Sequence, residues 1–406
     1  MKPIYMDHHA TTPMDPEVLD AMMPFLTSDF GNPSSSTHIY GRQARVAVEN
    51  AREQIAALIG AERSDEIILT SGATESDNLA LKGLAFRQTA GKGHFITIAT
   101  EHKAILDTAE FLKKQGFEVT YARIDSYGVV DLDDLRQQIR KDTLLITIQA
   151  ANSEIGTLQP IADIARIAHE NGIVFHSDAV QALGRMAVDV VKDGIDLLSI
   201  SAHKIYGPKG VGALYVKKGI RLQPLLHGGG HEHGMRSGTL NVPGIVGLGK
   251  AAEIAGRDLA TESQRQLQLR ERLRHGIESR IELVRLNGHP QQRLVNNLNY
   301  SFSFVEGESL MLACRDVALS SGSACTSASL QSSYVLRAIG VAETLAHSSI
   351  RFGLGKSNTA AEVDHLLDLL QKQVKRLREM SPLYDMAQEG VDLENYAWSP
   401  HDHHNH

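Results

Sequence analysis

Short apolar runs alternate with longer segments of helical periodicity between about Val46 and Tyr215. The run ARVAVENAREQIAALIG (44–60) places its apolar residues on one face of a helix, and Gly60 follows where a C-terminal cap belongs. The segment IADIARIAHENG (161–172) has the same periodicity. Seven short apolar runs predict β-strands: EIILT (66–70), HFITIA (94–99), EVTYA (118–122), LLITIQ (144–149), IVFHS (173–177), LLSIS (197–201) and GALYV (212–216).

Strands separated by helices need crossover connections, which favour a mainly parallel sheet covered on both faces. The pattern therefore predicts an α/β fold with a large domain built on a seven-stranded sheet. In such sheets ligands collect at the carboxyl ends of the strands. Residues that directly follow the predicted strands are therefore the first candidates for a functional site.

The pattern changes after the last predicted strand. LHGGGHEHGMRSGT (226–239) is rich in Gly and His and predicts a loop, and a long helical pattern spans about 243–280. A strand at LNYSFSFV (298–305) and helices at 309–319 and 360–380 predict a smaller α+β domain. We expect a large domain at 14–258 and a small domain made of 1–13 and 259–406, with the extended N-terminal dozen residues joining the small domain.

Composition narrows the functional classes. The 41 basic and 48 acidic residues give a net charge of -7, and aromatic residues are 5% of the chain, which argues against direct nucleic-acid binding. Cys314 and Cys325 are the two cysteines, and such sparse usage is typical of a reducing cytoplasm. The start MKPIYMDHHATTP has no apolar signal core, and no stretch reaches the roughly 18 apolar residues of a membrane helix.

Three glycine-containing motifs differ in what they support. GLGKS (353–357) lacks the Gly that a phosphate loop needs at Ile350 and has no strand directly before it, and GPKGVG (207–212) lacks the third Gly of a dinucleotide fingerprint. TSGATESDN (70–78) combines a strand end, a small-residue turn and a helix start, which suits a phosphate because free N–H groups and the helix dipole favour an anion. An ordinary capped strand–helix turn explains the same pattern.

A lysine and a carboxylate follow two of the predicted strands. Lys204, in SISAHKIYGPKG, comes just after a buried strand, where its amine could lose a proton and form a Schiff base; a solvated surface lysine is the alternative. Asp178 ends another strand, and a buried carboxylate there needs a cation. A Schiff-base lysine, a carboxylate for a ring nitrogen and an anion-binding helix start together match the requirements of pyridoxal phosphate.

These motifs and others in the same order resemble the cysteine desulfurases, which are fold-type I, class V pyridoxal-phosphate enzymes. The resemblance spans nearly the whole chain and is closest to the housekeeping IscS type that serves iron–sulfur cluster assembly. The motifs that carry it are ATTP (10–13), GNPSS (31–35), TSGATESDN (70–78), TEHKA (100–104), NSEIG (152–156), HSDAVQ (176–181), SAHKIYGPKG (201–210), GMRSGT (234–239), SSGSACTSAS (320–329) and SSIRFGLG (348–355).

The resemblance implies a role for each matching residue. Lys204 is the Schiff-base lysine that moves protons on the substrate, Asp178 pairs with the pyridine nitrogen, and His102 stacks on the ring and serves as acid or base. Asn152 and Arg351 hold the substrate carboxylate, although a surface ion pair is the alternative for Arg351. The remaining implied cofactor contacts are Ala73, Thr74, Ser201 and His203 at the phosphate, Gln181 at the ring hydroxyl, Asn152 as a further cofactor contact, and Thr239, which reaches the phosphate of a neighbouring subunit and so implies a homodimer.

The two cysteines have different surroundings in the sequence. Cys314 lies in an apolar helical pattern, as a buried small residue does. Cys325 lies in Ser320–Ser329, a run without large apolar side chains, so we expect an exposed, mobile loop over 320–333. The resemblance makes Cys325 the nucleophile that takes sulfur from L-cysteine as a persulfide and leaves L-alanine. No resident metal is expected, and the one metal contact left open is a transient iron–sulfur cluster held through Cys325 and a partner.

The resemblance also implies partners. The segment 381–406, with SPLYDMAQEGVDLENYAW at 381–398, is similar to the C-terminal segment that engages an iron–sulfur scaffold protein. Sulfur acceptors of tRNA thiolation and regulatory iron–sulfur assembly proteins are further implied partners. Three alternatives stay open at this point: a selenocysteine lyase, a class V aminotransferase, and a catalytically silent scaffold that keeps only the fold.

Overall fold

The computed structural model describes residues 3–87, 92–321 and 332–390, so Cys325 and the segment 391–406 lie outside the described residues. The helices are α1 (Pro16–Thr27), α2 (Ile39–Leu58), α3 (Ala73–Arg87), α4 (Lys103–Lys114), α5 (Leu132–Gln138), α6 (Ile161–Glu170), α7 (Val242–Arg280), α8 (Gly307–Ala313), α9 (Tyr334–Ala338), α10 (Glu343–His347), α11 (Ala360–Arg378) and α12 (Pro382–Gln388), with 3-10 turns η1 (Ser64–Glu66), η2 (Ala202–Lys204) and η3 (Glu232–Gly234). The strands are β1 (Ile4–Tyr5), β2 (Ile67–Thr70), β3 (His94–Ile98), β4 (Glu118–Ala122), β5 (Thr143–Thr147), β6 (Val174–Asp178), β7 (Leu197–Ser201), β8 (Gly212–Val216), β9 (Val284–Leu286), β10 (Asn297–Phe302), β11 (Val317–Ala318) and β12 (Ser349–Gly353).

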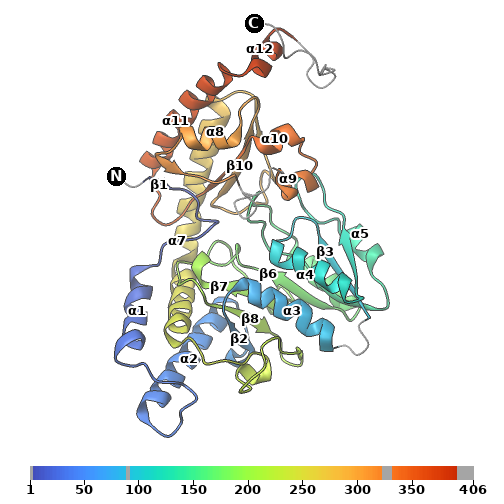
Figure 1. The fold of residues 1–406 in the computed structure, drawn as a ribbon, viewed down its shortest axis with the longest axis vertical. Coiled ribbons are helices and arrows are strands. Elements are labelled where there is room, and N and C mark those ends of the chain that lie inside the picture. The colour runs from blue at the N-terminus through green and yellow to red at the C-terminus, as the bar shows by residue number, and fades with distance from the viewer. Residues whose placement is uncertain (1–2, 88–91, 322–331, 391–406) are drawn as a thin grey trace.

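A seven-stranded sheet forms the larger, lower part of the molecule in Figure 1, with strand order β2-β8-β7-β6-β5-β3-β4. All seven strands predicted from the sequence are confirmed: three have the predicted bounds, and the other four have ends displaced by one or two residues. The four pairings from β7 to β4 are parallel, whereas β8 runs antiparallel to β7 and β2. The predicted α/β class with a mainly parallel sheet is therefore confirmed.

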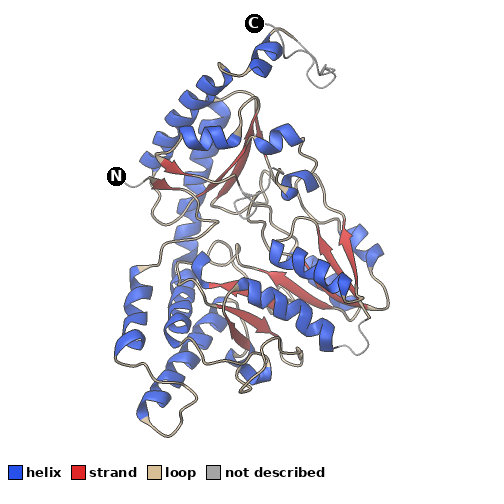
Figure 2. Ribbon diagram, in the orientation of Figure 1, coloured by secondary structure: helices blue, strands red, loops and turns tan. Residues whose placement is uncertain are grey.

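Alternation along the strands supplies a hydrophobic core on each face of this sheet. Ile67 and Leu69 of β2 belong to a core shared with α2, α6 and α7, whereas Ile68 belongs to a core shared with α3 and α4. Because successive strand side chains point to opposite faces, a near-continuous apolar run must be covered on both. Figure 2 shows the resulting arrangement of helices around the strands.

A smaller part of the fold lies at the top of Figure 1. It holds the antiparallel sheet β12-β10-β9 and the parallel pair β1-β11, and its core includes Met6 together with apolar residues of α7 and α11. The N-terminal strand β1 therefore pairs within this smaller part. Helix α7 has 39 residues, about 58 Å at 1.5 Å per residue, and contributes to the cores of both parts. The division at 14–258 stays a prediction.

Two local predictions were wrong. The helix expected at 309–319 ends at Ala313, because Val317 and Ala318 pair with Ile4 and Tyr5 as β11 and β1. A strand pairing across the chain thus overrides local helical periodicity. A strand, β12, also leads directly into GLGKS, contrary to expectation. The phosphate-loop interpretation stays excluded because Ile350 is a fully buried strand residue where that motif needs glycine.

Within the described ranges, no helix is both long enough and apolar enough to cross a membrane.

Close contact between α2 and α7 gives a test of the fold. A Cβ on Gly249 of α7 would lie 2.6 Å from the Cα of Ala51 in α2, so Gly249→Ala must push the helices apart. Alanine gains about 1 kcal/mol of helix propensity over glycine, but overpacking typically costs about 1–3 kcal/mol. We expect net destabilisation in urea unfolding monitored by circular dichroism.

Gly256→Ala is the matched control on the same helix. The nearest atom to a Cβ there is Leu58 Cδ1 at 3.7 Å, an ordinary contact, so this variant should gain up to about 1 kcal/mol. Equal effects of the two substitutions would contradict the close helix contact.

Candidate functional site

A cavity of about 600 Å³ opens at the carboxyl ends of β6 and β7, where the parallel-sheet rule places ligands. Its size is within the range of small-molecule sites. It is lined by His9, Ala10, Thr11, Ser71, Gly72, Ala73, Thr74, Glu75, His102, Lys103, Gln149, Ala151, Ser153, Glu154, Asp178, Val180, Gln181, Ser201, His203, Lys204, Lys209, Gly210, Tyr334 and Arg351.

Lys204 is held by the backbone of the N-terminal segment. It lies in η2, directly after β7, and its Nζ donates hydrogen bonds to the carbonyl oxygens of His9 and, at 2.8 Å, Ala10. Carbonyl oxygens favour the ammonium form without adding a full negative charge. The solvated surface lysine considered from the sequence is therefore excluded.

Asp178 ends β6 and is buried, with 8% of its surface exposed. Burial raises its pKa, while His102, the N–H of Val180 and Lys204 oppose that rise. Asp77 of α3 lies deeper and is fully buried, and both burial and the charge of Asp178 raise its pKa strongly. His176, 3.7 Å from Asp77, is kept neutral because burial lowers its pKa to about 3. Burial therefore favours the protonated form of Asp77 most strongly, and Asp178 is the carboxyl group that faces the cavity.

The first turn of α3 forms an anion-binding end of the cavity. Ala73 and Thr74 begin the helix after β2, and their free N–H groups and the helix dipole favour a negative group. A Cβ on Gly212 of β8 would lie 2.7 Å from the Cα of Gly72, so glycine is needed for β8 to pass this turn. The phosphate interpretation of TSGATESDN thus has the geometry it needs.

Ser201 and His203 line the same cavity. Thr11 Oγ1 lies 3.0 Å from His203 Nδ1. Burial, together with the charges of Lys204 and Lys209, lowers the pKa of His203 to about 4. At neutral pH this histidine is therefore an uncharged hydrogen-bonding group rather than a cation.

Arg351 of β12 brings a guanidinium from the smaller part of the fold into the cavity lining. It is 4% exposed, and its Nη2 donates to Asp7 Oδ1 at 2.7 Å while Nη1 donates to Ser153 O at 3.1 Å. The ion pair considered from the sequence exists, but it is buried rather than at the surface. A buried guanidinium is suited to a carboxylate ligand, because its N–H donors lie in one plane and can pair with both carboxylate oxygens.

His102 and Gln181 also line the cavity. His102 is the N-cap of α4 and its Nδ1 accepts from Ala104 N at 3.2 Å, so the neutral ring carries its proton on Nε2. Gln181 makes two hydrogen bonds with His9, one from its Nε2 to the carbonyl oxygen at 3.0 Å and one between its Oε1 and Nδ1 at 2.9 Å. Since an amide oxygen can only accept, Nδ1 of His9 must carry the proton.

Three of the residues singled out in the sequence do not enter the described cavity lining. Asn152 is buried behind it, with Nδ2 donating to Thr100 O and Oδ1 accepting from Glu154 N at 2.8 Å. Thr239 is exposed on the loop before α7. Cys325 lies outside the described residues, but just before that gap the carbonyl oxygen of Ser320 accepts a hydrogen bond from Arg351 N at 2.7 Å.

Several lining residues were missed by the sequence analysis. Glu154 stands in NSEIG beside Asn152, and Lys209 stands in GPKG beside Lys204, so both were within reach of the motifs already singled out. Tyr334 has no such signal, because its hydroxyl reaches Glu101 O at 2.7 Å from far along the chain.

The lining fits pyridoxal phosphate, the cofactor implied by the sequence resemblance. The cavity offers a lysine amine, a buried carboxylate and a helix start with hydroxyl and imidazole groups, as this cofactor requires. The residues that would hold it are Lys204 at its aldehyde carbon, Asp178 at its ring nitrogen, and Thr74, Ser201 and His203 at its phosphate.

Known proteins resemble this chain over most of its length. The aminotransferase class-V family model matches residues 4–366. The chain is 56% identical to cysteine desulfurase IscS of Anaeromyxobacter dehalogenans (strain 2CP-C) over 98% of this chain and 99% of that protein, and 55% identical to cysteine desulfurase IscS of Histophilus somni (strain 129Pt) with the same coverage.

Solved structures agree with this result. A NifS-like protein superposes with a TM-score of 0.86 at 38% identity, covering 92% of this chain and 99% of that one. A structure described as SspA in complex with cysteine superposes with a TM-score of 0.79 at 40% identity, covering 86% and 98%.

Glu154 gives the cavity a measurable pH dependence. Burial raises its pKa to about 7, although Ser333 and Arg351 oppose that rise. Between about pH 4.5 and 7 the folded chain keeps a proton that the unfolded chain has lost, so the free energy of unfolding falls as pH rises through this window. At about 1.4 kcal/mol per pH unit the total fall is about 3 kcal/mol.

Glu154→Gln cannot ionise and should not show this fall. We expect urea unfolding of the two proteins, each without cofactor, to give similar stabilities near pH 5 and a relative loss of about 3 kcal/mol for the parent near pH 8. Parallel stability curves would show that Glu154 is already ionised at pH 5.

Proposed function

The chain belongs to the class-V aminotransferase family, and from that premise we propose that it is a pyridoxal-phosphate-dependent cysteine desulfurase that releases L-alanine from L-cysteine and keeps the sulfur on Cys325. One observation carries the proposal: Lys204, Asp178 and Arg351 line a single cavity in a chain that matches cysteine desulfurases over 98% of its length.

The described residues divide the work of binding. Arg351 binds the substrate carboxylate, because its guanidinium is buried and presents parallel N–H donors. Asp178 pairs with the ring nitrogen, whose positive charge would favour the carboxylate, while burial strongly raises the pKa of Asp77 beneath it. Bound pyridoxal phosphate supplies an electron sink that makes the α-proton of the amino acid acidic.

Lys204 is the group that moves protons. Its Nζ lies on the carbonyl oxygens of His9 and Ala10, which stabilise the ammonium after the amine has taken the α-proton. The hydrogen bond from Ala104 N to Nδ1 orients the imidazole ring of His102 at the start of α4. In the neutral ring, the proton is on Nε2.

Cys325 completes the sulfur transfer. The thiolate sulfur of Cys325 bonds to the sulfur of the substrate, and the carbon–sulfur bond of the substrate breaks. The electron pair of the broken bond remains on the substrate carbon, which takes up a proton to give alanine. One L-cysteine and one enzyme thiol thus yield L-alanine and an enzyme persulfide without an external oxidant. Sulfide appears only when a reductant or an acceptor removes the outer sulfur.

We propose a homodimer with the α1–α2 surface at its interface. Groups of exposed apolar side chains often mark interfaces, and this surface exposes several large apolar side chains. They are Leu19, Met23, Leu26, Phe30, Ile39, Tyr40 and Val46, exposed by 45%, 45%, 55%, 70%, 53%, 48% and 59%. The Thr239 loop lies beside it, since Ser34 Oγ is 3.3 Å from His231 Nε2 and Arg52 of α2 forms a buried ion pair with Glu232 at 2.5 Å.

We further propose the cytoplasm as the compartment, and an iron–sulfur scaffold protein, sulfur acceptors of tRNA thiolation and regulatory assembly proteins as partners. Cysteine usage supports the compartment. Helix α12 supports a partner surface at 381–406, because it has no buried residue and follows α11 at the tip of the molecule (Figure 1).

The persulfide step is tested by Cys325→Ala. In single turnover with L-cysteine and a thiol reductant, we expect alanine formation to fall at least about 100-fold, while the absorbance of bound cofactor is unchanged. Mass spectrometry of the parent should find the added sulfur on Cys325.

Cys314→Ala is the matched control. Cys314 is fully buried and burial raises its pKa to about 12, so it supplies no thiolate, and its variant should keep at least half of the parent rate. Equal alanine release by Cys325→Ala and the parent would rule out the persulfide on Cys325 and point instead to a lyase of the selenocysteine lyase type, whereas transfer of the amino group to a keto acid would point to an aminotransferase.

The dimer is tested by Phe30→Asp combined with Leu26→Asp. Analytical ultracentrifugation should give the parent a mass of about twice 44.4 kDa and shift the double variant toward the monomer. Leu312→Asp, on α8 and 77% exposed, should leave the mass unchanged. If the double variant stays dimeric, the interface does not lie on the α1–α2 surface.

A further inference from the structure

The backbone around Lys204 is held by a segment just before α1. Thr12 donates to His203 O from both its N, at 3.1 Å, and its Oγ1, at 2.9 Å. Tyr206 N donates to Thr12 Oγ1 at 2.9 Å, and Asp15 N donates to Tyr206 O at 2.9 Å. These hydrogen bonds fix the position of the Lys204 loop relative to the N-terminal segment.

The same N-terminal segment is paired with β12, the strand that carries Arg351. Gly353 N donates to Met6 O at 2.8 Å, and His8 N donates to Gly353 O at 3.1 Å. Asp7 adds the ion pair to Arg351 at 2.7 Å. One link between Arg351 and Lys204 thus runs through residues 6–15.

Tyr206 provides a second link between the same two residues. Its hydroxyl accepts from Lys356 N at 2.7 Å, and Lys356 lies three residues beyond the end of β12. Tyr206 also has a positive φ of 66°, a strained conformation for a residue with a side chain that needs support from its surroundings. The two links close a ring of contacts from β12 to the Lys204 loop and back.

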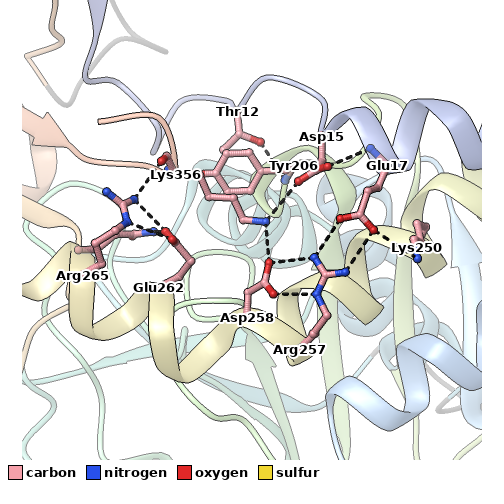
Figure 3. A network of polar contacts seen from close by, with 11 residues as sticks. Thr12, Asp15, Glu17, Tyr206, Lys250, Arg257, Asp258, Glu262, Arg265 and Lys356 are labelled. Atoms are coloured by element: carbon pink, nitrogen blue, oxygen red, sulfur yellow. Dashed lines mark hydrogen bonds and ion pairs between the residues drawn. The ribbon is translucent and has the colours of Figure 1, made fainter. Parts of the chain in front are cut away.

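Charged groups hold the Lys356 side of this ring (Figure 3). Lys356 Nζ lies 3.3 Å from Asp15 Oδ2 and 3.4 Å from Asp258 Oδ2, and 5.2 Å from the centre of the Tyr206 ring. Arg265 of α7 donates to Gly355 O at 2.9 Å. The loop after β12 is therefore fastened both to α7 and to the segment before α1.

We propose that Tyr206 is a positioning residue that, through Lys356, keeps Arg351 and Lys204 at the separation that L-cysteine needs. The inference rests on the proposed function, in which Arg351 binds the substrate carboxylate and Lys204 takes the proton from the adjacent carbon. A displacement of about 1 Å between such groups is enough to lower reactivity strongly.

Tyr206→Phe tests this role because it removes the hydroxyl acceptor and keeps the ring. Without the second link, only a fraction of molecules holds the productive separation, so the KM for L-cysteine should rise at least about fivefold. Bound substrate itself joins Arg351 to the Lys204 site, so kcat should change less than about twofold. The dissociation constant of pyridoxal phosphate should also stay within about twofold, because no cofactor contact is lost.

Hydrogen exchange gives a readout that does not depend on turnover. In the protein without cofactor, protection of the amides of 354–358 should fall at least about tenfold in Tyr206→Phe. The matched control is Tyr300→Phe, which removes a buried hydroxyl that donates to Glu278 at 2.7 Å within the smaller part of the fold. It should leave the KM and the protection of 354–358 unchanged.

An unchanged KM, unchanged protection of 354–358, or an equal effect of Tyr300→Phe would overturn the proposal. A loss of cofactor affinity beyond about fivefold in Tyr206→Phe would also overturn it, because that result indicates a general structural role. Failure of the proposed function is distinct, since the parent enzyme would then form no alanine from L-cysteine.

Discussion

The ammonium of Lys204 rests on the backbone carbonyl oxygens of His9 and Ala10, and much of the site depends on this contact. Because the contact to Lys204 uses the backbone of His9, the side chain of His9 is available to hydrogen-bond the side-chain amide of Gln181. The segment that supplies these oxygens also pairs with the strand of Arg351. Water would solvate the amine of a surface lysine. The amine of Lys204 is instead hydrogen-bonded by the N-terminal segment, which joins the two parts of the fold.

Burial decides which groups around the cavity are charged. Burial raises the pKa of both Asp77 and Asp178, and the neighbouring charge of Asp178 raises the pKa of the deeper Asp77 further. His176 and His203 are uncharged because burial lowers the pKa of each. The cavity lining thus combines the carboxyl groups of Glu75, Glu154 and Asp178 with the cations Lys204, Lys209 and Arg351, while the buried histidines act as neutral hydrogen-bonding groups.

The sequence predicted the sheet and much of the cavity lining because both follow from local patterns. Lys204 and Asp178 stand at the ends of strands that apolar runs mark clearly, and parallel strands bring such ends together. Tyr334 could not be predicted, because its place in the lining depends on a contact with Glu101 that no local pattern encodes. The same limit explains the error at 309–319, where pairing with Ile4 and Tyr5 overrides helical periodicity.

The position of the N-terminal segment has a consequence for biosynthesis. Ile4 and Tyr5 leave the ribosome early, but their partners Val317 and Ala318, and the strand that pairs with residues 6–8, are made near the end of translation. Such sequence-distant contacts form late because long loops must close first. The seven-stranded sheet can therefore fold on the ribosome well before the lysine site is complete, so a nascent chain would carry a formed sheet without a competent active site.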